Sequence, residues 1–158
     1  MTSRLDAART PVLAPGGDGP LDYICLVHQD DDALLAMDEA HYRAMVARTV
    51  DWLQRLEDSG RHVFSAGLQS AATATTVHGR NGRASTTDGP FAETKEHLGG
   101  FTVLKARDLN EAIAIASELA RISGTSVEVR PLLKPDATLA SPLDRRLVAA
   151  LHANRILA

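Results

Sequence analysis

Residues 21–27 constrain the fold more than any other part of this 158-residue chain. They are almost all apolar and β-prone, and polar and apolar side chains do not alternate along them. A strand with this pattern is typical of a sheet that is covered on both faces. The sequence therefore predicts a first strand that needs a cover on each side.

Helices and strands follow in a regular order. Asp38 is the expected cap of a first helix that ends at Gly60, and Asp108 with Glu111 forms the expected capping box of a second. The segments with strand patterns are residues 63–68, 73–78, 83–87, 101–104 and 125–130. The second and third of these segments are joined across Asn81-Gly82, which is the strongest short-range hairpin signal.

The order of these elements indicates a fold class. With the hairpin set aside, it is β-α-β-β-α-β, the ferredoxin-like pattern. We expect an α+β fold, with a ferredoxin-like sheet, an inserted β-hairpin and the helices on one face. Two helices leave the other face open, although the first strand needs a cover there too. A second copy of the chain, packed sheet against sheet, is the simplest cover, so the pattern predicts a homodimer.

The two ends of the chain differ in composition from its middle. Residues 1–20 are rich in Pro and Gly and are expected to form a disordered N-terminal arm. Residues 21–131 form the expected domain, and residues 132–158 a C-terminal extension. Ser141 and Pro142 predict a helix start in this extension, with Ser141 as its cap.

Composition excludes several classes of protein. A net charge of −3 and 4% aromatic residues supply neither a basic stripe nor a stacking platform, so no nucleic acid is expected as a partner. The chain has no apolar run of membrane-spanning length and no apolar segment at its N-terminus, which predicts no membrane association and no signal peptide. The single cysteine, Cys25, suits a reducing compartment, and we expect a cytoplasmic protein. Phosphate-loop, dinucleotide and metal-ligand motifs are absent from the sequence, so no cofactor or metal is expected.

Residues 88–96, Asp-Gly-Pro-Phe-Ala-Glu-Thr-Lys-Glu, form the strongest candidate site. Gly89 and Pro90 make a rigid turn, and a rigid loop can hold polar groups at fixed positions, as a binding site requires. Lys95 is the group best suited to meet an anion. The alternative is a solvated loop that serves as scaffold. The candidate ligand-binding residues are Gly89, Pro90, Phe91, Glu93, Lys95 and Glu96.

The chain resembles the DGPF-domain proteins, a branch of the YCII-related family. The resemblance runs from about residue 21 to residue 131 and rests on segments 74–77, 87–96, 98–101, 109–112 and 127–131. It implies a ferredoxin-like fold that pairs into a dimeric α/β barrel-like assembly. The YCII-related relatives also imply a His/Asp pair in a cleft, and a few of them act as lyase-like or isomerase-like enzymes on small ring-fission acids. His41 and Asp88 are the candidates for this catalytic pair.

Three functions remain open at this point. The leading interpretation is a dimeric domain that binds a small anionic metabolite in a polar cleft at residues 88–96, with turnover unproven. The second is a lyase or isomerase that uses His41 with Asp88, although His41 can equally be an exposed residue of the first helical turn. The third is a non-catalytic regulatory or protein-interaction module that uses residues 1–20 and 141–158 as contacts.

Removal of residues 1–20 should leave the fold intact, because a segment rich in Pro and Gly has little apolar surface to bury. We expect the melting temperature of the shortened chain to match that of the full chain in a calorimetric scan. A drop of many degrees would show that this segment docks on the folded domain.

Overall fold

The computed structural model describes residues 21–133 and 141–154. The chain divides into two compact units, and residues 20–132 form the larger one. The predicted disordered arm lies outside the described residues. The other unit contains helix α4 (Pro142–Ala153), which begins at its predicted cap: Ser141 Oγ accepts a hydrogen bond from the backbone N–H of Leu143 at 3.2 Å.

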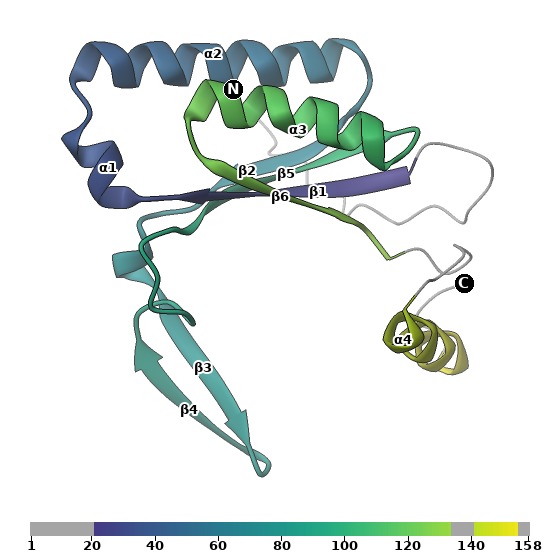
Figure 1. Ribbon diagram of the computed structural model, residues 1–158. Coiled ribbons are helices and arrows are strands. Elements are labelled where there is room, and N and C mark those ends of the chain that lie inside the picture. Colours follow the sequence, from purple (N-terminus) through teal and green to yellow (C-terminus); the bar gives the residue numbers. More distant parts are fainter. Residues whose placement is uncertain (1–20, 134–140, 155–158) are drawn as a thin grey trace, which may run out of the picture. The chain divides into compact units, whose positions relative to one another are not determined.

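Within residues 20–132, four antiparallel strands form one sheet (Figure 1). The strand order is β2 (His62–Gly67), β5 (His97–Ala106), β1 (Leu21–Gln29) and β6 (Ser126–Pro131). Two helices, α2 (Glu39–Asp58) and α3 (Leu109–Ser123), lie on the same face of this sheet. This mixed α and β architecture is compatible with the predicted ferredoxin-like fold.

The helices begin where the sequence predicts them. Asp38 caps α2 by accepting a hydrogen bond from the backbone N–H of His41 at 3.0 Å, and Asp108 caps α3 by accepting one from Glu111 at 2.9 Å. The Glu111 carboxylate accepts from the backbone N–H of Arg107, one residue before the predicted partner. None of the described helices is long and apolar enough to span a membrane.

A short helix, α1 (Asp31–Ala36), was not predicted. Asp30 caps it by accepting hydrogen bonds from the backbone N–H groups of Asp32 and Ala33. A carboxylate at the cap and acids in the first turn suit the positive end of a helix. Three consecutive aspartates, residues 30–32, are equally typical of a solvated loop, so the sequence alone does not distinguish a helix start from a loop here.

The core lies between the sheet and the helices. Tyr23, Cys25 and Leu104 point from the central strands toward α3, where Ala112 and Ala116 pack against them. A second cluster of Trp52, Leu56 and Leu119 joins α2 to α3. Each large apolar side chain buried in this way stabilises the fold by about 1.5–3 kcal/mol.

The opposite face of the sheet is apolar over β2, β5 and β1, whereas on β6 it carries Glu128 and Arg130, which pair in register with Leu26 and Ile24. Side chains alternate across a strand, so the neighbours of the core residues point away from the helices. In residues 20–132 no helix covers this face, and Phe64 there is 51% exposed, with its ring centroid 5.8 Å from that of Phe101. The apolar residues of this open face are Ile24, Leu26, Phe64, Phe101 and Val103. The first strand is thus apolar on both sides, as predicted.

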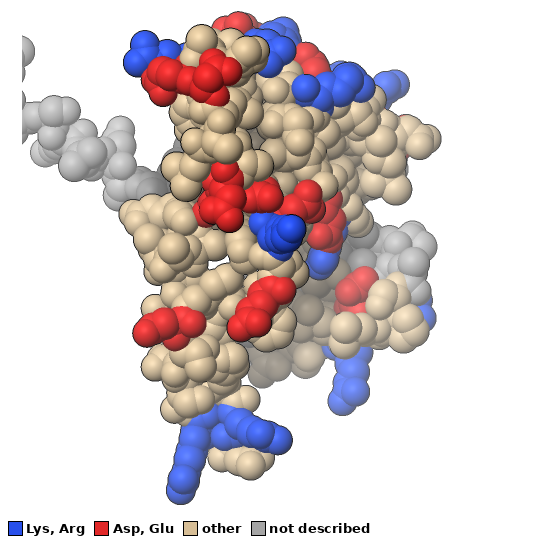
Figure 2. All heavy atoms as spheres, turned by 60° about the vertical axis from the view of Figure 1, so that its left-hand side comes forward, with Lys and Arg blue, Asp and Glu red and all other residues tan. Residues whose placement is uncertain are grey.

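The predicted hairpin is formed by β3 (Thr75–Arg80) and β4 (Arg83–Asp88) and extends away from the sheet (Figure 1). Asn81 and Gly82 have φ angles of 51° and 73°, which the predicted two-residue turn requires. Figure 2 shows basic side chains at the far end of this hairpin, where Arg80 and Arg83 are paired in register. Nearly all the side chains of the hairpin are exposed.

A β-bulge interrupts the pairing of β1 with β5. Val27 pairs with Gly100, but the next residue, His28, pairs with Leu98, so Gly99 is the extra residue. A Cβ on Gly100 would lie 2.9 Å from the backbone oxygen of Ala66, and glycine therefore permits the close approach of β2 to β5. The two glycines thus have different roles: Gly99 forms the bulge and Gly100 permits a close strand contact.

Substitution of Leu104 tests the core. Leu104 is fully buried, and Leu104→Ala should lower the free energy of unfolding by about 2–5 kcal/mol, because the lost methyl groups leave a cavity. Leu35→Ala is the matched control, since Leu35 is 84% exposed and its truncation should change the free energy by less than about 0.5 kcal/mol. Urea unfolding of both variants measures the difference, and equal effects would contradict this account of the core.

Candidate functional site

A pocket of about 630 Å³ lies at the base of the hairpin. Three segments line it: the adjoining ends of β1 and β5, the connection from β2 to β3 that includes the short helix η1 (Ala71–Thr73), and the loop that follows β4. The described lining residues are His28, Leu68, Gln69, Ser70, Ala71, Thr73, Ala74, Pro90, Phe91, Ala92, Thr94, Glu96, His97 and Leu98. The loop singled out in the sequence therefore forms one wall of a pocket.

Backbone contacts hold the start of this loop. The N–H of Gly89 donates to the carbonyl of Ala74 at 2.8 Å, and the Thr76 hydroxyl donates to the carbonyl of Gly89 at 2.8 Å. Gly89 has a φ of 102°, which is costly for other residues. Further along, the Thr94 hydroxyl donates to the carbonyl of Glu96. The loop is thus fixed to the hairpin at its first turn.

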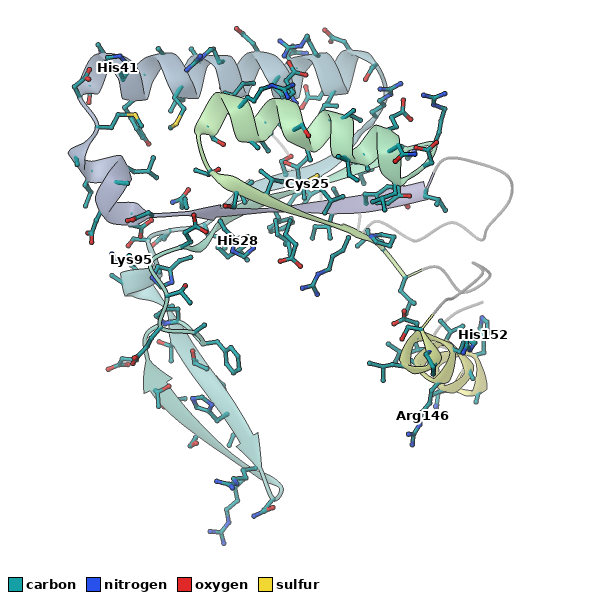
Figure 3. The ribbon with its side chains drawn as sticks, in the orientation of Figure 1. Cys25, His28, His41, Lys95, Arg146 and His152 are labelled. Atoms are coloured by element: carbon teal, nitrogen blue, oxygen red, sulfur yellow. The ribbon has the colours of Figure 1, made fainter. Side chains whose placement is uncertain are left out.

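The candidate residues of the loop separate into two groups. Pro90, Phe91 and Glu96 line the pocket, and Gly89 holds the turn beside it. The other three candidates, Asp88, Glu93 and Lys95, are exposed and are not among the described lining residues. Lys95, the cation expected to meet an anion, is labelled on this loop in Figure 3.

His41 lies elsewhere. Its side chain is 80% exposed in the first turn of α2, and its Nδ1 is bonded to the carboxylate of Asp38, the cap of the same helix. Figure 3 shows His41 on the helix side of the sheet, whereas Lys95 lies on the other side. Among the described residues no contact joins His41 to Asp88, and the structure places the two on separate elements.

Two histidines that sequence reasoning did not single out line the pocket instead. The Nε2 atom of His28 is buried and has no hydrogen-bond partner among the described residues. It lies 3.4 Å from Glu128 Oε2, which is within ion-pair range but lacks hydrogen-bond geometry. Figure 3 shows His28 on the side of the sheet away from the helices. His97 enters from the neighbouring strand, where it pairs in register with Gln29.

Asp31 supports one wall of the pocket. Its carboxylate accepts hydrogen bonds from the Ser70 hydroxyl at 2.7 Å, from Gln29 Nε2 at 3.0 Å and from the backbone N–H of Ala71 at 3.3 Å. These bonds tie α1 to η1. The pKa of Asp31 lies below its ordinary value. The hydrogen bond from Ser70 is the largest cause, the one from Gln29 comes next, and the nearby His97 adds to the effect.

The carboxylates around the histidines have partners of their own. Arg130 is hydrogen-bonded to Glu128 and is the main cause that lowers the pKa of this carboxyl group. Glu96 accepts a long hydrogen bond of 3.4 Å from the hydroxyl of Ser126. The pocket thus combines two imidazoles with hydroxyl and amide groups, and its one described lining carboxylate belongs to Glu96.

Other kinds of chemistry lack the necessary groups here. Burial raises the pKa of the Cys25 thiol to about 11, so the thiol stays protonated and is a poor nucleophile near neutral pH. In the described ranges, no group of three or more His, Cys, Asp or Glu side chains is placed to hold a metal ion. The imidazoles can bind an anion when protonated, or accept a proton when neutral.

The chain belongs to the YCII-related domain family, which matches residues 21–134. It is also 34% identical over 113 residues to an uncharacterized protein from Rhizobium meliloti (strain 1021). That match covers 70% of this chain and 90% of the relative. The membership implied by the motifs of the sequence is thus confirmed.

Asp31→Asn tests the role of Asp31 in the pocket wall. The folded pKa lies below the ordinary value of 3.8, so the ionised carboxylate stabilises the fold above that pH, and its contribution is lost as the pH falls through the lower folded pKa. The variant should be less stable than the wild type in urea at pH 7, and the gap should shrink below pH 3.8. Asp88→Asn, at an exposed position, is the matched control and should show no such gap.

Proposed function

We propose that this YCII-related domain binds a small anionic metabolite in the pocket at the base of the hairpin. The observation that carries the proposal is the pair of imidazoles, His28 and His97, that line this pocket, where the buried Nε2 of His28 lies 3.4 Å from Glu128 Oε2 without good hydrogen-bond geometry. A buried polar atom without a partner costs about 1–3 kcal/mol, and a ligand atom can remove that cost. Unsatisfied buried groups of this kind are typical of functional sites.

The composition of the pocket supports an anion. His28 and His97 carry positive charge when protonated, and Gln69 offers amide donors, whereas the hydroxyl protons of Ser70 and Thr94 are already donated to Asp31 and to the carbonyl of Glu96. The carboxylates of Asp31 and Glu128, which border this region, are already bonded to other groups of the protein. Phe91 and Pro90 add an apolar wall, which suits a small carboxylic acid with a hydrocarbon body.

A second candidate function is catalysis of the lyase or isomerase kind. A histidine beside a carboxylate can abstract a proton next to a carbonyl group. His28 lies 3.4 Å from Glu128 and lines the pocket, whereas His41 does not line it. This contact favours His28 with Glu128 over the pair predicted from the sequence, His41 with Asp88, as the acid–base pair of such an enzyme.

We also propose that the domain is a homodimer in which the open faces of two sheets pack together. Ile24, Leu26 and Phe101 supply an apolar surface that no helix of residues 20–132 covers. Exposed apolar patches of this kind mark interaction surfaces. His28 follows Leu26 on the same face of β1, so a second copy on this face would also close the histidine pocket.

The third interpretation, a protein-interaction module, has support in α4. Leu143 and Leu147 of this helix are 72% and 47% exposed and are spaced to lie on one face. Such a stripe suits a helix that packs on a partner protein. It does not account for the histidine pocket, which is why the metabolite-binding interpretation is preferred.

A thermal-shift experiment with benzoate tests the proposed ligand class. Saturating benzoate should raise the melting temperature by several degrees, since a ligand present at 100 times its Kd stabilises the native state by about 2.7 kcal/mol. Benzamide has nearly the same shape without the charge and should give no shift. An equal rise in melting temperature with both compounds would contradict the preference for an anion. If none of the three carboxylates benzoate, acetate and succinate raised the melting temperature, the proposal would be contradicted.

Matched histidine variants locate the site. His28→Gln should weaken benzoate binding about tenfold or more, because a hydrogen bond to a charged group is lost. His78→Gln is the control, since His78 is exposed on the hairpin and contacts Thr87 outside the pocket. If His41 and Asp88 formed the site instead, the result would be the reverse: His41→Gln would impair benzoate binding and His28→Gln would not.

A further inference from the structure

A second pocket, of about 370 Å³, lies between the sheet and the helices. It shares none of its lining residues with the histidine pocket. Most of its wall is apolar and comes from α2, from the edge strand β2 and from its neighbour β5. Its volume is at the small end of the range for sites that hold small molecules.

Most polar groups in this wall are already satisfied. Thr49 donates its hydroxyl proton to the carbonyl of Met45, Ser123 donates to the carbonyl of Leu119, and Gln29 Nε2 donates to Asp31. The hydroxyl protons of Thr49 and Ser123 and one N–H of Gln29 are therefore committed within the protein. These side chains help to shape the pocket, but these donors need no partner from a ligand.

Two donors in the wall have no acceptor. Trp52 is 2% exposed, and its indole Nε1 has no hydrogen-bond partner among the described residues. Thr102 is 5% exposed, and its Oγ1 accepts from the Ser65 hydroxyl at 3.0 Å without donating to any described residue. A buried N–H or O–H without an acceptor destabilises a fold, so both groups favour an acceptor atom brought from outside.

The direction of the Thr102 donor depends on the tautomer of His62. His62 Nε2 lies 2.8 Å from Ser65 Oγ, and Ser65 in turn donates to Thr102. The donation from Ser65 to Thr102 goes with an imidazole proton on Nε2: each group in this chain then donates to the next, and the proton of Thr102 is left for a ligand. A proton on Nδ1 alone would reverse the chain and turn the Thr102 hydroxyl toward Ser65. Glu57 lies 3.6 Å from the other nitrogen of His62, at the far end of the chain.

The side chains that line this pocket indicate the charge of its ligand. None of the described lining residues is Asp, Glu, Lys, Arg or His. A charged molecule would lose its hydration without gaining a counter-ion, which is costly in an apolar pocket. We infer that this pocket binds a neutral, largely apolar small molecule with a carbonyl oxygen, which accepts hydrogen bonds from Trp52 Nε1 and the Thr102 hydroxyl.

Trp52 provides a direct probe, because it is the single tryptophan of the chain. Nitrogen-15 NMR of the full chain therefore shows one indole N–H signal, which can be followed during a titration with cyclohexanone. We expect this signal to shift saturably. Methylenecyclohexane has the same ring with a CH2 group in place of the oxygen, and it should bind at least about fivefold more weakly. Equal binding of the two probes, or no saturable shift with cyclohexanone, would overturn the inference.

Two variants assign the contact. Thr102→Val removes the hydroxyl at nearly constant volume and should weaken cyclohexanone binding about fivefold, while the exposed Thr86→Val control leaves it unchanged. Val46→Phe at the partly exposed rim should fill the pocket and abolish the shift with a native-like spectrum. Retained binding in a folded Val46→Phe protein would place the probe elsewhere and refute the assignment.

Discussion

The antiparallel pairing of β1 with β5 on one side and β6 on the other is the constraint on which the rest of residues 20–132 depends. It puts the most apolar strand, β1, in the interior of the sheet, where the side chains of the strand point alternately to the two faces of the sheet. Tyr23 and Cys25 meet the helices, while Ile24 and Leu26 meet none of them. Because α2 and α3 lie on the same side, residues 20–132 complete one core by themselves, and no helix of these residues covers the apolar surface on the other side.

The two pockets follow from the same arrangement. The bulge at Gly99 shifts the register at the end of β1, so that His28 and His97 border the loop that Gly89 fixes. On the helix side, the close approach of β2 to β5 at Gly100 forms part of the wall of the smaller pocket. Two imidazoles and the Glu96 carboxylate line the histidine pocket, for which an anion is proposed, whereas the smaller pocket has no described charged side chain in its wall.

Local signals in the sequence predicted the elements well, because they depend on a few neighbouring residues. The caps at Asp38 and Asp108 and the turn at Asn81-Gly82 are of this kind. The turn at Gly89 after β4 was also predictable, because Asp-Gly-Pro is a local turn signal. The place of His28 and His97 in one pocket was not predictable, since it depends on a one-residue bulge that shifts the pairing of β1 with β5. The feature of the sequence that could have pointed to these two histidines is their position near the end of β1 and at the start of β5.

The central claim is that a second copy of the chain covers the open face of the sheet, and light scattering at micromolar concentration tests it most directly. The account predicts about twice the chain mass of 16.9 kDa for the wild type. Phe64→Glu places a charge on the open face and should give the single chain mass with an unchanged helical signal, while Leu35→Glu on the exposed side of α1 should remain dimeric. A wild-type protein that is monomeric under these conditions would contradict the account.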